Sequence, residues 1–195
     1  MTLTYVVTDG EFDGPDPARH SMLAFASVAL VGGEIGPRFE AVLEPLPNAV
    51  ADADVMAWFR SEPDAYAAAT SNPRPPGDVM ADFASFVRGL PGTPVFAAHP
   101  LAVDGKWFDH YLRRFTGDWL MSGPRDKNPL FPLPSLCIAS FLAGRLGWEI
   151  SRCRYANYPS EWLGNHPHSH RAIDDALGYA SLLKMLLDLP TPTVA

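Results

Sequence analysis

The chain of 195 residues carries 15 Lys and Arg against 22 Asp and Glu, so its formal net charge is −7, and 47% of its residues are hydrophobic. That apolar content can fill a core, which excludes a disordered chain, and the length fits a single domain over residues 1–195, with a core at about 4–188 and a short Pro-rich tail. The acidic balance excludes a protein that coats long nucleic acid, because phosphate binding needs a basic surface. The charge does not exclude an enzyme that binds only the end of a nucleic-acid strand through metal ions.

Membrane and disulfide classes are disfavoured too. The longest apolar stretches, such as residues 22–31, fall short of the roughly 20 residues that a spanning helix needs, and residues 1–10 lack the pattern of a signal peptide. Only Cys137 and Cys153 are present, without a CxxC motif, which speaks against a disulfide framework or a Cys-rich zinc site. We interpret both as buried thiols and expect a cytoplasmic protein without a membrane partner.

The predicted elements alternate between strands and helices. Apolar runs predict strands over residues 4–8, 21–31, 38–43 and 93–98, with a hairpin turn at Gly32 and Gly33. Helical spacing predicts helices over residues 49–60, 78–89, 103–115, 135–146 and 172–187. Loops are expected over residues 62–76, with a short helix inside, and over residues 116–134 and 148–168. This order favours a mixed α/β sheet covered by helices.

Asp9 and Glu11 come directly after the first predicted strand. Residues i and i+2 of a strand point to the same face, so both carboxylates aim at one spot. Their repulsion is costly unless a cation lies between them. The alternative is a solvated acidic loop, because Asp13 and Asp16 follow.

Asp104 stands at the start of the helix predicted over residues 103–115. Its spacing places it on the buried face of that helix, while Asp109 falls off this face and is expected in solvent. The apolar residues of the buried face are Trp107, Phe108, Tyr111, Leu112 and Phe115. The alternative interpretation of Asp104 is a plain helix N-cap.

Asp174 and Asp175 open the last predicted helix, and the helical period separates them. At about 100° per residue, Asp174 falls on the polar stripe and belongs to solvent, whereas Asp175 falls on the apolar side. A carboxylate on an apolar face needs a partner, and a metal ion is one. His170 lies close enough to share a site with Asp175, although a lone histidine is more often structural.

These three segments, Asp9/Glu11, Asp104 and His170/Asp175, resemble in order and spacing the motifs of the DEDDh family of 3′–5′ exonucleases, which includes ribonuclease T, oligoribonuclease and polymerase proofreading subunits. The resemblance spans residues 4–188. Asp-Gly-Glu-x-Asp-Gly-Pro and His-Arg-Ala-Ile-Asp-Asp-Ala look like a bacterial branch of stand-alone members. Many relatives have Thr at the position of Phe12 and Asn at that of Pro100; the second departure affects expected substrate contacts rather than metal binding.

The resemblance implies a ribonuclease H-like α/β fold, a five-stranded mixed sheet with helices on both faces. It also implies two Mg²⁺ or Mn²⁺ ions, which suit hard oxygen ligands. Asp9, Glu11 and Asp175 would hold the ion that activates water, Asp9 would bridge to the second ion, and Asp104 would help to place it. His170 would take the proton of the attacking water, a role that an unperturbed histidine pKa of about 6.5 suits.

Further residues are candidates for substrate contacts or for a second metal. Phe12 is a candidate to stack on the terminal base, with core packing as the alternative, and Arg171 is the best candidate for a phosphate contact. Other basic residues of the second half either line a phosphate path or are solvated: Arg113, Arg114, Arg125, Lys127, Arg152 and Arg154. His166, His168 and His170 suggest a zinc cluster, but no cysteine lies nearby and Pro167 restricts the geometry. We therefore interpret His168 as a second site histidine or a loop residue.

We therefore expect a metal-dependent 3′–5′ exonuclease that acts on short single-stranded RNA or DNA 3′ ends, with RNA slightly favoured. The alternative is a nucleic-acid or nucleotide-binding module on the same fold without catalysis. The presence of all five motif residues argues against lost catalysis. Relatives of this kind are often homodimers.

Overall fold

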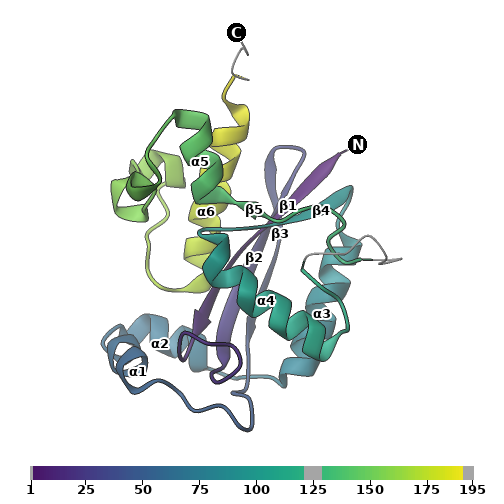
Figure 1. The fold of residues 1–195 in the computed structure, drawn as a ribbon, viewed down its shortest axis with the longest axis vertical. Coiled ribbons are helices and arrows are strands. Elements are labelled where there is room, and N and C mark those ends of the chain that lie inside the picture. The colour runs from purple at the N-terminus through teal and green to yellow at the C-terminus, as the bar shows by residue number, and fades with distance from the viewer. Residues whose placement is uncertain (1, 121–128, 191–195) are drawn as a thin grey trace.

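The computed structural model describes residues 2–120 and 129–190. Five strands form one mixed sheet in the order β3-β2-β1-β4-β5 (Figure 1). Their bounds are β1 (Leu3–Phe12), β2 (Met22–Val31), β3 (Glu34–Val42), β4 (Thr93–Ala98) and β5 (Leu136–Cys137). β2 runs antiparallel to both β1 and β3, while β4 runs parallel to β1 and β5. The expected five-stranded mixed sheet is confirmed.

Helices cover this sheet on both faces (Figure 1). Their bounds are α1 (Ala53–Arg60), α2 (Pro63–Thr70), α3 (Pro76–Gly89), α4 (Leu101–Phe115), α5 (Ile138–Leu146) and α6 (Ala172–Asp188). Short 3₁₀ turns follow α5, at η1 (Ile150–Arg152), η2 (Tyr155–Asn157) and η3 (Ser160–Leu163). Within the described ranges, no helix is both long and apolar enough to cross a bilayer.

Consecutive residues of β1 serve opposite sides of the sheet. Val6 is fully buried in a core that includes Phe83 of α3 and Phe108 of α4. Val7 is fully buried in the other core, with Leu142 of α5 and residues of α6. This alternation follows from the two-residue period of a strand. The same period places Asp9 and Glu11, further along β1, on the side of the sheet that Val7 occupies and that α6 covers.

Several boundaries differ from the sequence expectation. β1 was expected to end at residue 8, but β2 continues to pair with it through Glu11 opposite Ala24, so the strand reaches Phe12. The helix expected from residue 135 begins at Ile138 instead, because Leu136 and Cys137 pair with the end of β4. The third strand starts at Glu34 rather than at residue 38. The hairpin turn is confirmed, since Gly32 and Gly33 both have positive φ.

Candidate active site

β1 carries two acidic side chains into the space under the start of α6. Asp9 and Glu11 lie opposite Ala26 and Ala24 of the neighbouring strand β2. Cross-strand partners project to the same side of the sheet, and alanine is short. The space above these carboxylates is therefore not filled from β2. The alternative of a solvated acidic loop is wrong for Asp9 and Glu11, because both belong to a paired strand.

α4 brings Asp104 to the free edge of β1. The pairing of β1 with β4 ends at Val7 and Ala97. Beyond that point the backbone N–H of Gly10 donates to Asp104 Oδ1 at 3.2 Å. Asp104 is buried, with 3% exposure, and the helix N-cap is Pro100. The buried-face prediction is confirmed, and the N-cap interpretation is wrong.

The first turn of α6 separates its two aspartates as the helical period predicts. The Asp175 side chain is 2% exposed and that of Asp174 is 23% exposed. Ligand oxygens of Asp9, Glu11 and Asp175 all lie within 4.8 Å of one another. Three of the predicted carboxylates therefore converge, from β1 and from α6. Asp104 is linked to this cluster by its hydrogen bond from the backbone N–H of Gly10, the residue between Asp9 and Glu11.

Asp174 is not simply solvated, as the sequence had predicted. It accepts a hydrogen bond from Ser169 Oγ at 2.7 Å and lies 3.6 Å from Arg171 Nη1. The backbone N–H of Ser169 donates to Asp175 Oδ1 at 3.2 Å. Both aspartates therefore hold the segment that carries His170 over the start of the helix.

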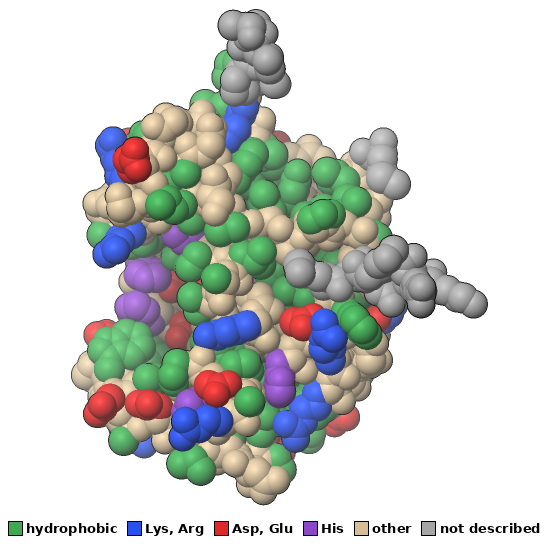
Figure 2. All heavy atoms as spheres, viewed as in Figure 1, with side chains coloured by type: hydrophobic (Ala, Val, Ile, Leu, Met, Phe, Trp, Pro, Cys, Tyr) green, Lys and Arg blue, Asp and Glu red, His purple; other side chains and the backbone are tan. Residues whose placement is uncertain are grey.

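His170 is placed beside the carboxylates by that segment. Its φ is +55°, in the left-handed region that few side chains adopt. Nitrogens of His170 and of His168 lie within 4.8 Å of an Asp175 oxygen and of one another. Figure 2 shows histidine side chains beside a hollow on this face, with acidic side chains behind them. His170 also contacts Trp58 of α1, edge to face at 4.9 Å between ring centroids.

Sequence reasoning missed Trp58 and Tyr155 next to this site. Trp58 is exposed to 45%, although it touches His170. Tyr155 stacks on His168 with ring centroids 4.2 Å apart. Neither residue belongs to a motif: Trp58 comes from α1, far away in sequence, and Tyr155 from the 3₁₀ turn η2, 13 residues before His168. An exposed tryptophan in an amphipathic helix was the one signal that pointed to Trp58.

The buried carboxylates are protonated more readily than ordinary ones. Burial, with repulsion from Asp104, Glu11 and Asp175, raises the pKa of Asp9 well above its usual range. Burial, with repulsion from Asp175 and Asp104, raises the pKa of Glu11 to about 9. Burial raises the pKa of Asp104 to about 8, against the hydrogen bond from Gly10.

A divalent cation fits this donor set. The ligand atoms of Asp9, Glu11 and Asp175 are all carboxylate oxygens, which hard cations such as Mg²⁺ and Mn²⁺ prefer. Burial and, after it, mutual repulsion raise the pKa of Asp9 and of Glu11. A cation between the oxygens would remove that repulsion and favour their ionised form.

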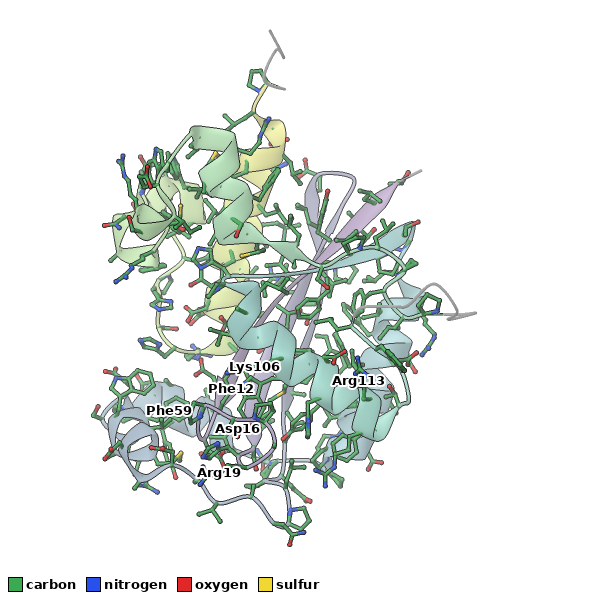
Figure 3. The ribbon with its side chains drawn as sticks, viewed as in Figure 1. Phe12, Asp16, Arg19, Phe59, Lys106 and Arg113 are labelled. Carbon is green, nitrogen blue, oxygen red and sulfur yellow. The ribbon has the colours of Figure 1, made fainter. Side chains whose placement is uncertain are left out.

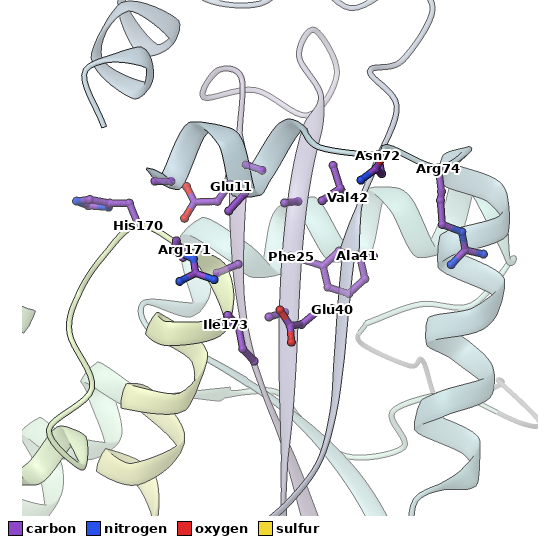
Figure 4. Close-up of a pocket in the computed structure, with 16 residues that line it drawn as sticks. Glu11, Phe25, Glu40, Ala41, Val42, Asn72, Arg74, His170, Arg171 and Ile173 are labelled. Atoms are coloured by element: carbon purple, nitrogen blue, oxygen red, sulfur yellow. The ribbon is translucent and has the colours of Figure 1, made fainter. Parts of the chain in front are cut away.

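A cavity of about 270 Å³ extends from this site across β2 and β3 (Figure 4). Glu11, His170 and Arg171 line one end of it, and Asn72 and Arg74 line the other (Figure 4). The side chain of Arg171 is 47% exposed and reaches Asp174 without being enclosed. The cavity thus joins Glu11 of the acidic centre to two arginines, Arg171 and Arg74.

Phe12 lies on the opposite face of β1 from the carboxylates. Its ring stacks on Trp107 with centroids 4.5 Å apart and planes 6° apart. It remains half-buried, and Figure 3 shows it at the end of the sheet beside the loop that carries Asp16. Lys106 Nζ donates to the carbonyl of Pro15 at 2.7 Å, which ties α4 to the loop after β1.

The other basic residues do not gather around the carboxylates. Arg113 pairs with Asp109 at 2.7 Å and lies over Trp119 at 4.1 Å. Arg152 lies 3.6 Å from the centre of the Trp148 ring. Arg125 and Lys127 lie outside the described residues. A continuous phosphate path through these residues stays a prediction.

Comparison with known families gives one match over most of the chain. The sequence profile of the RNase T family, described as exonuclease, matches residues 6–183. No curated protein matches the chain by sequence.

Solved structures share its fold at low sequence identity. The nuclease domain of 3′hExo, described as a DEDDh family member bound to rAMP, has a TM-score of 0.64 at 13% identity, over 95% of this chain and 91% of that one. Exonuclease I of E. coli in complex with a dT13 oligonucleotide has a TM-score of 0.65 at 13% identity, over 96% of this chain and 41% of that one. Cell-death related nuclease 4 has a TM-score of 0.62 at 15% identity, over 96% of this chain and 64% of that one. These likenesses confirm the expected ribonuclease H-like exonuclease fold.

Proposed function

The chain belongs to the RNase T family of exonucleases, and from this we propose that it is a metal-dependent enzyme that removes nucleotides from the 3′ end of single-stranded nucleic acid. The observation that carries the proposal is the convergence of Asp9, Glu11 and Asp175, with oxygens within 4.8 Å of one another. A binding module would have no need for three carboxylates whose ionised forms repel one another. The non-catalytic alternative is therefore the weaker one.

Asp9, Glu11 and Asp175 would hold one divalent ion, and Asp9 with Asp104 would help to hold a second. When bound, Mg²⁺ or Mn²⁺ supplies stabilisation of the charge that develops on the attacking and leaving oxygens of the phosphodiester. Asp104 also fixes the end of β1, because it accepts the N–H of Gly10. Asp104 would thus position Asp9 and Glu11 as well as add negative charge to the metal site.

His170 would accept a proton from the attacking water at a ring nitrogen. Its left-handed backbone and the hydrogen bonds of Ser169 to Asp174 and Asp175 direct the ring toward Asp175. The ring is half-buried, so the proton can pass on to solvent. The position of His170 beside Asp175 supports a role as general base.

Arg171 and Phe12 would contact the substrate. Arg171 borders the cavity beside Glu11 and His170 and offers a guanidinium to a phosphate. Phe12, whose ring is held by its stack on Trp107, would wedge against the terminal base. The net charge of −7 favours short substrates, and we expect a slight preference for RNA. Homodimer formation stays a prediction, which light scattering of the purified chain measures.

The test is degradation of 5′-labelled single-stranded RNA and DNA of the same sequence, with Mg²⁺, with Mn²⁺ and with EDTA. The expected result is a ladder that shortens from the 3′ end and disappears in EDTA and in Asp9→Ala. Asp78→Ala is the matched control, since Asp78 is an exposed carboxylate on α3, and it should degrade both substrates as the unaltered chain does. Intact substrates in every lane, with retained binding, would favour the non-catalytic module instead.

A further inference from the structure

Asp175 belongs to two clusters of possible metal ligands. The first is the oxygen cluster with Asp9 and Glu11, and the second contains His168 and His170. In each cluster the ligand atoms lie within 4.8 Å of one another. The two clusters differ in chemistry, because the second offers two imidazole nitrogens and one carboxylate oxygen.

His168 is held with an unsatisfied nitrogen turned toward Asp175. Its Nδ1 lies 2.9 Å from Asp175 Oδ2, yet the atom is buried and has no hydrogen-bond partner, so the contact is close in distance but wrong in direction for a hydrogen bond. The ring stacks on Tyr155, and the backbone N–H of His168 donates to Tyr155 Oη at 2.9 Å. A buried nitrogen without a partner costs free energy, and a cation ligated there would remove that cost.

His170 completes the set as the second imidazole. Its ring centroid lies 4.5 Å from that of His168, with the planes at 58°. Both histidines are half-buried, so an ion has access from outside. The sequence argument against zinc rested on Pro167 and on missing cysteines. It did not foresee that the fold brings Asp175 to these histidines as a third ligand.

Donor chemistry separates the two clusters. Magnesium prefers oxygen ligands, whereas zinc is commonly bound by His nitrogen and by carboxylate oxygen. Three protein ligands and one open position are a common zinc arrangement. Donors about 2.0–2.2 Å from a tetrahedral zinc lie about 3.3–3.5 Å from one another. His168 Nδ1 and Asp175 Oδ2, now 2.9 Å apart, would move slightly apart, and small side-chain rotations allow the three donors to reach that spacing.

We propose that His168, His170 and Asp175 bind one Zn²⁺ and that this ion inhibits hydrolysis. Binding would occupy the ring nitrogen that His170 uses as a base and an oxygen that Asp175 gives to the catalytic ion. The inhibitory half of the proposal rests on the proposed exonuclease function, whereas the binding half does not. The enzyme would then work only where free zinc is scarce.

Zinc binding is measured first, by competition with a chromophoric chelator, on the full chain. We expect one Zn²⁺ per chain, and the same in Asp9→Ala, which breaks the oxygen cluster but leaves the nitrogen cluster. His168→Phe keeps a ring to stack on Tyr155 but removes the ligand, and should weaken binding at least about tenfold, since loss of even an outer partner of a ligand costs that much. His166→Phe is the matched control, because His166 lies in the same loop outside both clusters, and should bind as the unaltered chain does.

Inhibition is measured next, as the zinc concentration that halves each variant's own zinc-free rate in excess Mg²⁺. His168→Phe and His168→Gln should both raise that concentration at least about tenfold, and His166→Phe should leave it unchanged. Equal inhibition of all variants would assign the ion to the oxygen cluster and overturn the proposal. So would unchanged zinc binding in folded His168→Phe. If binding follows the expectation but no variant hydrolyses nucleic acid, the proposed function fails and the zinc site stands.

Discussion

Asp104 accepts a hydrogen bond from the backbone N–H of Gly10, a residue 94 positions earlier in the chain. The bond joins two acidic motifs that are remote in sequence, and it lies where β4 has stopped pairing with β1. Gly10 is the residue between Asp9 and Glu11. Its backbone therefore sets the position of both carboxylates.

Gly10→Ala should destabilise the protein. A Cβ at this position would lie 2.7 Å from Phe12 Cζ, so the Phe12 ring would have to leave its stack on Trp107. Overpacking of this kind costs about 1–3 kcal/mol, which denaturant unfolding measures. Gly144→Ala is the control: nothing lies within 4 Å of its added Cβ in α5, and stability should rise by about 0.5–1 kcal/mol. Equal stability of Gly10→Ala and the unaltered chain would contradict the assigned packing.

Asp175→Ala and Asp174→Ala should differ sharply in activity. Asp175 is an oxygen ligand of the proposed catalytic ion, so its loss should lower the hydrolysis rate by at least about a hundredfold. Asp174 contacts Ser169 and Arg171 and belongs to neither ligand cluster, so its loss should leave the rate nearly unchanged. Single-turnover rates on the same oligonucleotide measure both. Equal losses of hydrolysis rate in the two variants would contradict the assignment of Asp175, rather than Asp174, as the metal ligand.

The sequence predicted the site better than its surroundings. The periods of strand and helix were enough to place Asp9, Glu11, Asp104 and Asp175 on faces, because a period is a local property of the chain. The end of β1 could not be placed, since Asp9 and Glu11 are held in the strand by pairing with β2, which the apolar pattern of β1 alone does not reveal.

Contacts that the helical period does not describe also decided the details around the histidines. Local pattern assigned Asp174 to solvent, but Ser169 and Arg171 fold back on it. Trp58 reaches His170 across more than a hundred residues of sequence, a contact that no local pattern encodes. The short strand β5 escaped notice because two residues carry no measurable period.

His99 should make stability fall in mild acid. Burial lowers the pKa of His99 to about 4 from a usual value near 6.5, while its Nε2 lies 2.7 Å from Tyr158 Oη. Between these values the unfolded chain binds a proton that the folded chain does not. Stability is therefore fully present above about pH 6.5 and is lost toward pH 4, by about 3 kcal/mol.

Thermal unfolding of the unaltered chain and of His99→Phe across that pH range measures this effect. The variant loses the contact with Tyr158, so its melting temperature should be lower near neutral pH. The gap between the two curves should narrow as pH falls, because the variant has no proton to take up at this position. A constant gap would contradict the assignment.

Without metal, the buried carboxylates should make stability fall as pH rises, which is opposite to the effect of His99. The folded chain keeps protons on Glu11 up to about pH 9 and on Asp104 up to about pH 8, whereas the unfolded chain loses them near about pH 4. In EDTA these groups therefore lower stability as pH rises from about 4 to about 9, since the unfolded state binds fewer protons there. A divalent ion binds the ionised cluster, so added Mg²⁺ should raise the melting temperature more at higher pH. Asp9→Asn should flatten the curve in EDTA and lose the Mg²⁺ effect, while Asp78→Asn should keep both. Parallel curves with and without Mg²⁺ would mean that the carboxylates do not hold the ion.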